Sequence, residues 1–256
     1  MPELFEIVHE DPDLLVVNKP AGLVCHPTKT DEYSSLIGRV RLYLGNDDGR
    51  LVNRLDRETS GLVLVAKSNE AAGELGKLIE SSGVRKEYGA IVHGFVTLDE
   101  FTIDAPLGKD ERSAVAIKDC VRADGAAAQT RVRVLKRFTR DAREFSSLSV
   151  QPISGRKHQI RIHLAHCAHP IVGDKIYGPD ELIYLRFVEN RMTVEDRAQL
   201  ILTNHALHAA RLSFRWRERD WQFTAKPSEE FQAFAGGTWP NTPAAMDGAP
   251  VRSQKP

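Results

Sequence analysis

The sequence has few cysteines and no long apolar run. Its three cysteines, Cys25, Cys120 and Cys167, are widely spaced and form no CxxC pair. Such a set does not make a disulfide framework, so reduced cytosolic thiols are expected. No stretch of about 18 uncharged apolar residues is present, which argues against a membrane span. The N-terminus is acidic and lacks an apolar run, so no signal peptide is expected and the predicted location is the cytoplasm.

The net charge of the chain is zero, because its 35 Lys and Arg residues balance its 35 Asp and Glu residues. Nucleic-acid binders are usually basic overall, so this balance does not by itself suggest one. The charges are unevenly distributed, however. Residues 1–48 hold nine acids and four bases, whereas bases outnumber acids by about two to one from Pro106 to Lys175. The basic excess of the second segment could bind a polyanion such as a nucleic acid. Alternatively, these basic residues only form a solvent-exposed surface without a binding role.

The predicted elements alternate irregularly along the chain. Strands are expected at residues 5–9 and 14–18 around Asp11-Pro12-Asp13, a turn whose proline presets one backbone angle. Further strands are expected at 51–52, 62–66, 88–92, 130–135, 145–150 and 212–216, and helices at 34–44, 68–79, 158–167 and 194–202. Because tight strand–helix–strand repeats are absent, this order favours an α+β fold with a mixed sheet over a parallel doubly wound one.

The densest group of chemically active residue types is Asn53-Arg-Leu-Asp-Arg-Glu-Thr-Ser-Gly-Leu-Val-Leu-Val-Ala-Lys67. Asp56 lies between Arg54 and Arg57, and the segment then enters an apolar strand. Neighbouring cations favour the ionised carboxylate that a nucleophile or base requires, and the strand holds it on a rigid element. Taken alone, an Arg-Asp-Arg triplet is better explained as a structural salt bridge on a turn.

Two further segments change this interpretation. Arg85-Lys-Glu-Tyr-Gly-Ala-Ile-Val-His-Gly94 places a tyrosine at the start of an apolar strand. Gly155-Arg-Lys-His-Gln-Ile-Arg-Ile-His-Leu-Ala165 leads from a basic helix start to a loop, His169-Pro-Ile-Val-Gly-Asp-Lys-Ile-Tyr-Gly178. Together with Asp13-Leu-Leu-Val-Val-Asn-Lys-Pro-Ala-Gly22 and the Arg-Leu-Asp-Arg-Glu-Thr-Ser-Gly stretch, these segments closely resemble the RluA-type pseudouridine synthases. The resemblance spans most of the chain, through Leu207-His-Ala209, and stops before the tail.

The resemblance implies both a fold and a reaction. The family has a bent, mostly antiparallel mixed sheet with flanking helices, and its active site lies in a central cleft between two halves. The implied activity is that of an RNA pseudouridine synthase, an isomerase that cleaves the glycosidic bond of a uridine and re-forms it at carbon 5. The reaction needs no metal or other cofactor, and the substrate would be ribosomal or transfer RNA. It does need a carboxylate beside the sugar, a pocket for the detached base and a means of flipping the nucleotide.

The matched motifs imply a role for each of several residues. Asp56 corresponds to the essential catalytic aspartate, which either attacks the sugar or removes a ribose proton. Arg54 corresponds to the residue that helps to extrude the target nucleotide. Tyr88 corresponds to the tyrosine that stacks on the flipped base, because an aromatic ring holds a flat base without reading its sequence. Arg161 corresponds to the basic residue that pairs with the aspartate.

Other matched positions have less direct roles. Arg156 and His158, in the same motif as Arg161, are expected to contact RNA. Lys19-Pro20 matches an N-terminal motif of the family, for which a structural role is expected. One position departs from the pattern, since the family usually has histidine where this chain has Asn53. Because Asp56 is intact, catalytic activity is expected to persist. The replacement of histidine by Asn53 is expected to alter either a contact with RNA or a hydrogen bond that orders the loop.

The resemblance also predicts how the chain is organised. A single catalytic domain is expected over residues 1–234, and the protein is expected to be a monomer. The first motif starts near residue 13, which leaves no room for the RNA-binding S4 domain common in related enzymes, so the catalytic domain itself should recognise RNA. The tail over residues 235–256 is rich in Gly, Pro and Ala and is expected to be disordered.

A zinc site and an aromatic RNA-binding surface are two alternatives that residue types suggest. The potential zinc ligands are His158, His163, His166, Cys167 and His169. No second pair has the spacing of His163 and His166, so metal binding is disfavoured. Trp216, Trp221 and Phe223 could stack on single-stranded RNA, but their near-alternation favours core positions in a strand.

Two other function classes remain as alternatives. A non-catalytic RNA-binding module of the same fold is slightly favoured by Asn53 and by the neutral net charge. The joint presence of Asp56, Tyr88 and Arg161 opposes it. A glycosidase with a pair of carboxylates would need a second acid, for which Glu58 is nearby in the sequence. A solvated Glu58 is expected instead.

Overall fold

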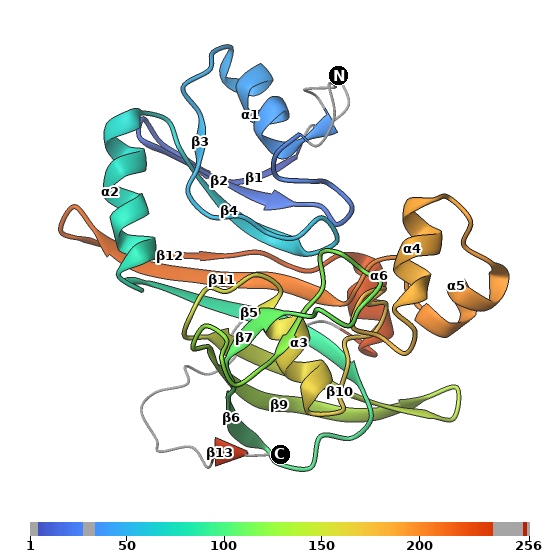
Figure 1. Cartoon of the computed structure of the whole chain (residues 1–256). Helices are drawn as coiled ribbons and strands as arrows, with labels where there is room; N and C mark the ends of the chain where they lie inside the picture. The colour runs from blue at the N-terminus through green and yellow to red at the C-terminus, as the bar shows by residue number, and fades with distance from the viewer. Residues whose placement is uncertain (1–4, 28–33, 238–252, 255–256) are drawn as a thin grey trace. The chain divides into compact units, whose positions relative to one another are not determined.

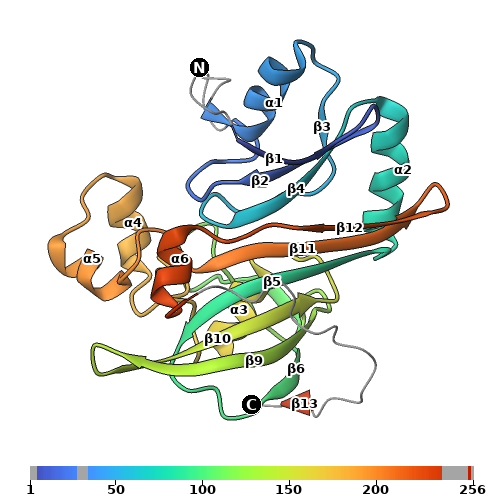
Figure 2. The same cartoon turned by 180° about the vertical axis from the view of Figure 1, so that it is seen from behind.

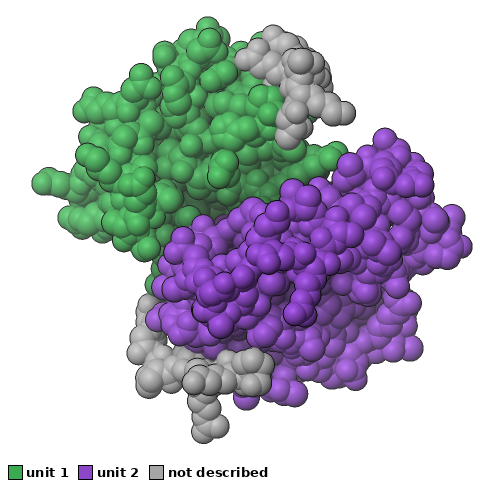
Figure 3. Space-filling model, viewed as in Figure 1, with its two compact units in different colours: residues 1–87, 208–241 green, residues 88–207, 242–256 purple. Residues whose placement is uncertain are grey.

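The computed structural model describes residues 5–27, 34–237 and 253–254, and the chain divides into two compact units. Unit 1 comprises residues 1–87 and 208–241, and unit 2 comprises residues 88–207 and 242–256 (Figure 3). The prediction of a single catalytic domain is not tested by this division and stays a prediction. Most of the tail for which disorder was predicted, residues 238–252 and 255–256, lies outside the described residues.

In unit 1 the strand order is β1-β2-β4-β11, with β3 paired to β4 and β12 paired to β11. The strands are β1 (Glu6–Glu10), β2 (Leu14–Lys19), β3 (Arg50–Leu51), β4 (Ser60–Ala66), β11 (Leu207–Trp216) and β12 (Arg219–Thr224). All of these pairs are antiparallel except β4 and β11, which pair in parallel through His208↔Ser60 and Ala209↔Gly61. The helices are α1 (Leu36–Leu44), α2 (Asn69–Glu80) and α6 (Glu229–Phe234) (Figure 1).

Local side-chain caps define the helices of unit 1. Ser35 Oγ accepts a hydrogen bond from Gly38 N at 3.2 Å at the start of α1, which ends at Gly45 with a φ of 69°. Ser68 Oγ accepts a hydrogen bond from Ala71 N at 3.2 Å at the start of α2. A serine at the N-cap satisfies a free backbone N–H, and glycine adopts the left-handed conformation at a helix end. The predicted end at Gly45 is confirmed, and of the two residues that the sequence offers as cap of the second helix, Ser68 and Asn69, the cap is Ser68.

The apolar core of unit 1 lies between α2 and the strands. Leu62 and Leu64 of β4 pack with Ala71 and Leu75 of α2, and all four are fully buried. Figure 1 shows α2 alongside this group of strands. The burial follows from helical spacing, which places residues four apart on the same face of the helix.

The aromatic residues of β11 and β12 belong to this core. Trp216 and Phe223 are buried, and Trp221 is packed against them. Trp216 Nε1 donates a hydrogen bond to a carboxylate oxygen of Glu74 at 2.8 Å, and Trp221 Nε1 donates one to the carbonyl of Trp216 at 3.3 Å. Buried indole N–H groups usually find such a partner. The interpretation of these aromatics as core residues is therefore confirmed.

Unit 2 contains a second group of strands in the order β5-β10-β9-β6-β13. Its elements are β5 (Val84–His93), which starts in unit 1, β6 (Glu100–Asp104), β7 (Leu107–Lys109), β8 (Asp119–Val121), β9 (Gln129–Arg140), β10 (Arg143–Pro152), β13 (Ser253–Gln254), α3 (Gln159–His166), α4 (Leu182–Val188) and α5 (Val194–Leu200). Strands β5, β10, β9 and β6 form antiparallel pairs in that order, and β13 pairs in parallel with β6. Strands β7 and β8 form a separate antiparallel pair. Helix α3 covers one face of this group (Figures 1 and 2).

Both units thus combine helices with mostly antiparallel strands, so the predicted α+β fold with a mixed sheet is confirmed. Helix α4 and the short strands β6 to β8 were not predicted from the sequence. Among the described residues, none of the helices is both long and apolar enough to cross a membrane.

Candidate functional site

Asp56 lies in the loop between β3 and β4 of unit 1. The side chains of Asn53 and Leu55 are buried on the inner side of this loop, with 7% and 9% of their surface exposed. Those of Arg54 and Arg57 are exposed, and that of Asp56 is partly buried. The loop is therefore held by its buried residues, and the exposed Arg54 and Arg57 lie on either side of the partly buried Asp56 in the sequence.

The ammonium group of Lys19 supports this loop from beneath. Its Nζ donates hydrogen bonds to the carbonyls of Pro20 at 2.9 Å, Leu23 at 2.7 Å and Arg57 at 3.1 Å. The Arg57 carbonyl also accepts the backbone N–H of Gly22 at 2.9 Å. Since the Lys19 side chain is fully buried, these carbonyls replace the water that an exposed ammonium would bind. The Lys-Pro-Ala-Gly motif thus fixes the loop that carries Asp56.

Lys19 also contributes to the electrostatics of the loop. Burial lowers the pKa of Lys19 to about 8, and the negative charge of Asp56 opposes that shift. With a pKa of about 8, most Lys19 side chains carry a proton at neutral pH. A positive charge therefore lies behind the carboxylate as well as beside it. The sequence analysis assigned Lys19 a structural role only, and the structure adds this electrostatic one.

Two more contacts anchor the inner side of the loop. The amide of Asn53 donates from Nδ2 to the Leu62 carbonyl at 3.3 Å and accepts the Leu64 N–H at Oδ1 at 2.8 Å. Asn53 therefore orders the loop against β4, which is one of the two roles considered for this position. The Sγ atom of Cys25 lies 3.3 Å from the backbone N and 3.4 Å from the carbonyl O of Leu55. Burial raises the pKa of the Cys25 thiol, which favours the neutral form that can donate to that carbonyl.

The last residues of the signature are fixed by β11. Gly61 has a φ of 113°, and a Cβ atom there would lie 2.3 Å from the Ala209 carbonyl oxygen, so only glycine fits. The adjacent Ser60 Oγ lies 2.9 Å from Nδ1 of His208, whose Nε2 lies 3.0 Å from the Ala225 carbonyl. Burial lowers the pKa of His208 to about 4, so the ring is neutral, donates from Nε2 and accepts from Ser60. His208 was missed as a support of the site, and its only signal was the Leu207-His-Ala209 block.

In unit 2, Arg161 of α3 forms a buried ion pair with Asp174. Its Nε and Nη2 donate to the two carboxylate oxygens of Asp174 at 2.7 Å and 2.9 Å, and the side chains are only 6% and 0% exposed. Oδ1 of Asp174 also accepts the N–H groups of Ile176 at 2.9 Å and Tyr177 at 3.0 Å. Burial alone would raise the pKa of Asp174, but the charge and hydrogen bonds of Arg161 outweigh it and hold the pKa well below its usual range.

The glycines of the 169–178 loop make room for Asp174. Gly173 has a φ of 82°, and a Cβ atom there would lie 2.6 Å from the Asn204 carbonyl oxygen. A Cβ atom at Gly178 would lie 2.1 Å from the carbonyl oxygen of Asp174. The two glycines therefore allow a tight turn that points the carboxylate of Asp174 towards Arg161. Asp174 is the main residue that sequence reasoning missed in this unit.

Tyr177 and His158 extend the network around Arg161. The Arg161 guanidinium carbon lies 5.0 Å from the centroid of the Tyr177 ring, which suits a cation–π contact. The Tyr177 hydroxyl accepts the Asp119 N–H at 3.2 Å and lies 2.9 Å from Nδ1 of His158. The described contact of His158 is thus with the protein, and its predicted contact with RNA stays a prediction. So does that of Arg156, which is exposed and donates from Nε to the Ala127 carbonyl at 3.2 Å.

His163, one of the potential zinc ligands, is used in packing. Its Nδ1 lies 2.8 Å from Thr130 Oγ1 and its Nε2 lies 2.9 Å from the carbonyl of Ala105. Nε2 therefore carries the proton, and Nδ1 accepts from the threonine hydroxyl. Within the described ranges no group of three or more His, Cys, Asp or Glu side chains could hold a metal ion.

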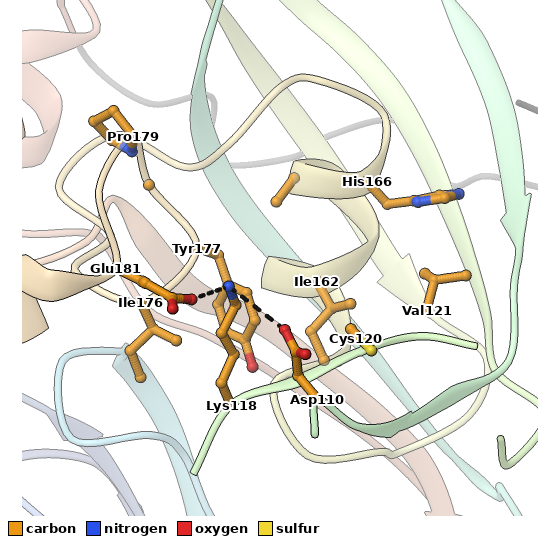
Figure 4. Close-up of a pocket in the computed structure, with 12 residues that line it drawn as sticks. Asp110, Lys118, Cys120, Val121, Ile162, His166, Ile176, Tyr177, Pro179 and Glu181 are labelled. Atoms are coloured by element: carbon orange, nitrogen blue, oxygen red, sulfur yellow. Dashed lines mark hydrogen bonds and ion pairs between the residues drawn. The ribbon is translucent and has the colours of Figure 1, made fainter. Parts of the chain in front are cut away.

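A hollow of about 410 Å³ lies beside α3 in unit 2 (Figure 4). Figure 4 shows Lys118 between two carboxylates at its edge, those of Asp110 at 3.7 Å and Glu181. Because both acids neutralise the lysine, the hollow does not present a basic surface to an RNA phosphate. Cys120 and His166 also line it.

The predicted site residues are therefore distributed over both units. Asp56 and Arg54 belong to unit 1, whereas Arg161 and Tyr88 belong to unit 2. Tyr88 is half-buried on β5, where it pairs with Val150 of β10. The predicted pairing of Arg161 with Asp56 joins the two units and stays a prediction.

The buried pair in unit 2 has a consequence for stability. Arg161→Ala removes the guanidinium that pairs with the buried Asp174, and Asp174→Asn removes the charge of the carboxylate that holds the guanidinium. Each change should lower the free energy of unfolding by about 3–5 kcal/mol. The double variant should be destabilised by less than the sum, because the second change removes the group left unpaired. Urea unfolding of the four proteins measures this coupling.

The exposed pair Arg215–Asp220 serves as the control, since its side chains are 67% and 81% exposed. Its coupling in the same kind of cycle should stay below about 1 kcal/mol. If the effects of Arg161→Ala and Asp174→Asn simply add, the two residues do not support each other energetically.

The sequence and the fold are similar to those of known proteins. Residues 13–166 match the family described as RNA pseudouridylate synthase. The uncharacterized RNA pseudouridine synthase YlyB of Bacillus subtilis is 35% identical over 216 residues, which cover 82% of this chain and 64% of that protein. The ribosomal large subunit pseudouridine synthase D of Pseudomonas aeruginosa is 38% identical over 179 residues, which cover 68% of this chain and 53% of that protein. The chain thus spans between half and two thirds of the length of these relatives.

Solved structures show the same fold. Human RNA pseudouridylate synthase domain containing 1 has a TM-score of 0.71 at 24% identity, covering 89% of this chain and 86% of that one. Human RNA pseudouridylate synthase domain containing 4 has a TM-score of 0.68 at 25% identity, covering 88% and 90%. At such identities the likeness is evidence of the fold. The sequence match over residues 13–166, together with a relative 35% identical over 82% of the chain, shows that this chain belongs to the RNA pseudouridylate synthase family.

Proposed function

We propose that this protein isomerises uridine to pseudouridine in RNA, with Asp56 as the catalytic carboxylate. The observation that carries the proposal is the loop between β3 and β4. Its backbone is anchored by Lys19 and Asn53, and it presents the partly buried Asp56 between exposed arginines. A reactive carboxylate must be held in one geometry, and supports on rigid strands provide this. Family membership identifies the reaction that such a loop would serve.

The proposed reaction breaks one carbon–nitrogen bond and forms one carbon–carbon bond within a single nucleotide. The bond between the ribose and nitrogen 1 of uracil breaks, the base is retained and turned, and carbon 5 bonds to the same ribose carbon. The proton on carbon 5 is then lost and nitrogen 1 gains one, so no oxidant or reductant is consumed. Asp56 acts at the sugar, while Arg54 helps to extrude the nucleotide and Tyr88 holds the detached base. Arg161, oriented by Asp174, pairs with the carboxylate.

We infer that the substrate is ribosomal RNA of the large subunit. Relatives from Pseudomonas aeruginosa, Neisseria meningitidis and Haemophilus ducreyi are named ribosomal large subunit pseudouridine synthase D, at 34–38% identity. Transfer RNA is the other class that the family resemblance suggested. Either substrate implies action in the cytoplasm. Mapping pseudouridines in cellular RNA with and without this gene identifies the modified positions.

The role of Asp56 is tested by Asp56→Asn, which keeps the shape of the side chain and removes its charge. Pseudouridine formation should fall by at least about a hundredfold, because an asparagine amide can neither attack the sugar nor accept a ribose proton as the carboxylate would. RNA affinity and melting temperature should remain close to those of the unchanged protein. Tritium release from RNA labelled at carbon 5 of uridine measures the rate. Glu58→Gln, in the same loop, is the control and should keep its activity.

Substantial turnover by Asp56→Asn, in a preparation free of the unchanged enzyme, would show that Asp56 is not the catalytic carboxylate. Loss of activity in Glu58→Gln as well would instead favour a mechanism with two carboxylates.

The role of Tyr88 is tested by comparing Tyr88→Phe with Tyr88→Ala. Stacking uses the ring face, so Tyr88→Phe should bind RNA normally, whereas Tyr88→Ala should weaken capture of the flipped base by about 1–3 kcal/mol. If the hydroxyl transfers the proton from carbon 5, Tyr88→Phe will also turn over more slowly. Single-turnover rates, RNA affinities and thermal melts distinguish these effects. A Tyr88→Ala protein that melts early but converts bound RNA at the normal rate would show that the tyrosine only packs.

A further inference from the structure

The hairpin of β9 and β10 extends beyond the rest of the strands in unit 2. Pairing of β10 with β5 ends at Phe145↔His93, and pairing of β9 with β6 ends at Glu100↔Arg133. Among the described residues, the strand pairing of residues 136–144 runs across their own turn, so they form a two-stranded ribbon. At its base the carbonyl of Glu144 accepts the Gly94 N–H at 2.8 Å. Both views show this ribbon projecting from unit 2 (Figures 1 and 2).

The ribbon is basic in a chain whose net charge is zero. Its charged residues are Lys136, Arg137, Arg140, Asp141, Arg143 and Glu144, and all six are exposed. The bases thus outnumber the acids by four to two. The ribbon also lies within the basic segment from Pro106 to Lys175.

The strand register separates these charges between the two faces of the ribbon. Directly paired residues share a face, and the pairs Lys136↔Ser147, Phe138↔Phe145 and Arg140↔Arg143 alternate with Arg137↔Ser146 and Thr139↔Glu144. One face therefore carries Lys136, Arg140 and Arg143 together with the Phe138 ring, and the acid Glu144 lies on the other. The basic face is defined here by Lys136, Phe138, Arg140 and Arg143.

The pairing of Arg140 with Arg143 does not stabilise the ribbon. Arg140 lies directly opposite Arg143, and like charges at opposite positions of an antiparallel pair are destabilising. The ion pair between Arg140 and Asp141 is 3.9 Å long, with side chains 47% and 92% exposed, so it contributes little. Arg137 on the opposite face is different, because it donates to the Val96 carbonyl at 2.6 Å and to Asp99 at 2.7 Å. That arginine secures the base of the ribbon.

An aromatic ring accompanies the cations. Lys136 Nζ lies 5.6 Å from the centroid of the Phe138 ring, which itself stacks on Phe145 at 5.7 Å with an interplanar angle of 28°. The Phe138 ring is only partly buried. Cations beside a ring suit RNA, which offers phosphates and flat bases together.

We propose that the basic face of this ribbon binds the phosphate backbone of the substrate RNA, outside the residues that carry the chemistry. This inference rests on the proposed RNA substrate. Phosphate contacts position a protein on nucleic acid without reading its sequence. Basic side chains at free strand edges also hinder unwanted strand pairing, and that alternative predicts no effect on RNA affinity.

The test is the double variant Arg140→Gln/Arg143→Gln, which removes two charges and adds none. Its affinity for deproteinised ribosomal RNA should fall by more than about tenfold at 0.1 M KCl. The slope of log affinity against log salt should become shallower by about 1.4–1.8, because each lost phosphate contact removes about 0.7–0.9. Arg215→Gln/Arg219→Gln, at the exposed turn of β11 and β12 in unit 1, is the matched control and should keep both values. Thermal melts confirm that all three proteins are folded.

The rate at saturating RNA distinguishes this proposal from the proposed function. The Arg140→Gln/Arg143→Gln protein should convert bound RNA at the unchanged single-turnover rate. If the unchanged protein forms no pseudouridine, the proposed function is wrong, but the RNA affinities of the variants still test the basic face. Unchanged affinity and salt slope in Arg140→Gln/Arg143→Gln, or an equal loss in the control pair, would overturn the basic face as an RNA-binding surface.

Discussion

The buried ammonium of Lys19 is the interaction on which the geometry of the proposed catalytic loop depends. It connects the carbonyls of Pro20 and Leu23, in its own segment, with that of Arg57, which lies 38 residues away in the sequence. A buried cation is tolerated only where hydrogen bonds replace its water, and each of these carbonyls would in turn be left unsatisfied without it. The same group places a positive charge near Asp56. Loop position and loop electrostatics therefore have a common origin.

In the second unit, too, a buried charged side chain supports a proposed site residue, but here the buried support is an anion and the supported residue a cation. There a buried carboxylate, Asp174, holds the cation Arg161, for which a functional role is proposed, and accepts two backbone N–H groups as well. A bidentate pair fixes the plane of the guanidinium as well as its position. In both units a buried charged group supports a residue for which a role at the reaction centre is proposed. Such supports restrict the motion of a side chain without taking part in the chemistry.

Local patterns in the sequence predicted much of the fold and part of the site. The Ser68 cap, the helix end at Gly45 and the loop around Asp56 each depend on neighbouring residues, so a short motif suffices to find them. Asp174 could not be found in this way, because its partner is thirteen residues away across a folded loop. The turn between β11 and β12 was also missed, since Arg217 and Glu218 adopt positive φ angles where Gly or Asn would be expected. Tertiary packing determines both.

The pKa of the Lys19 ammonium, measured by NMR on lysine-labelled protein, tests the role of this buried cation most directly. The signal is assigned by its loss in Lys19→Arg. We expect a pKa of about 8, well below the ordinary value of 10.5, and a still lower value in Asp56→Asn, because the attraction of the carboxylate is then gone. A Lys19 pKa near 10.5 that does not respond to Asp56→Asn would show that the ammonium is neither buried nor coupled to the loop that carries Asp56.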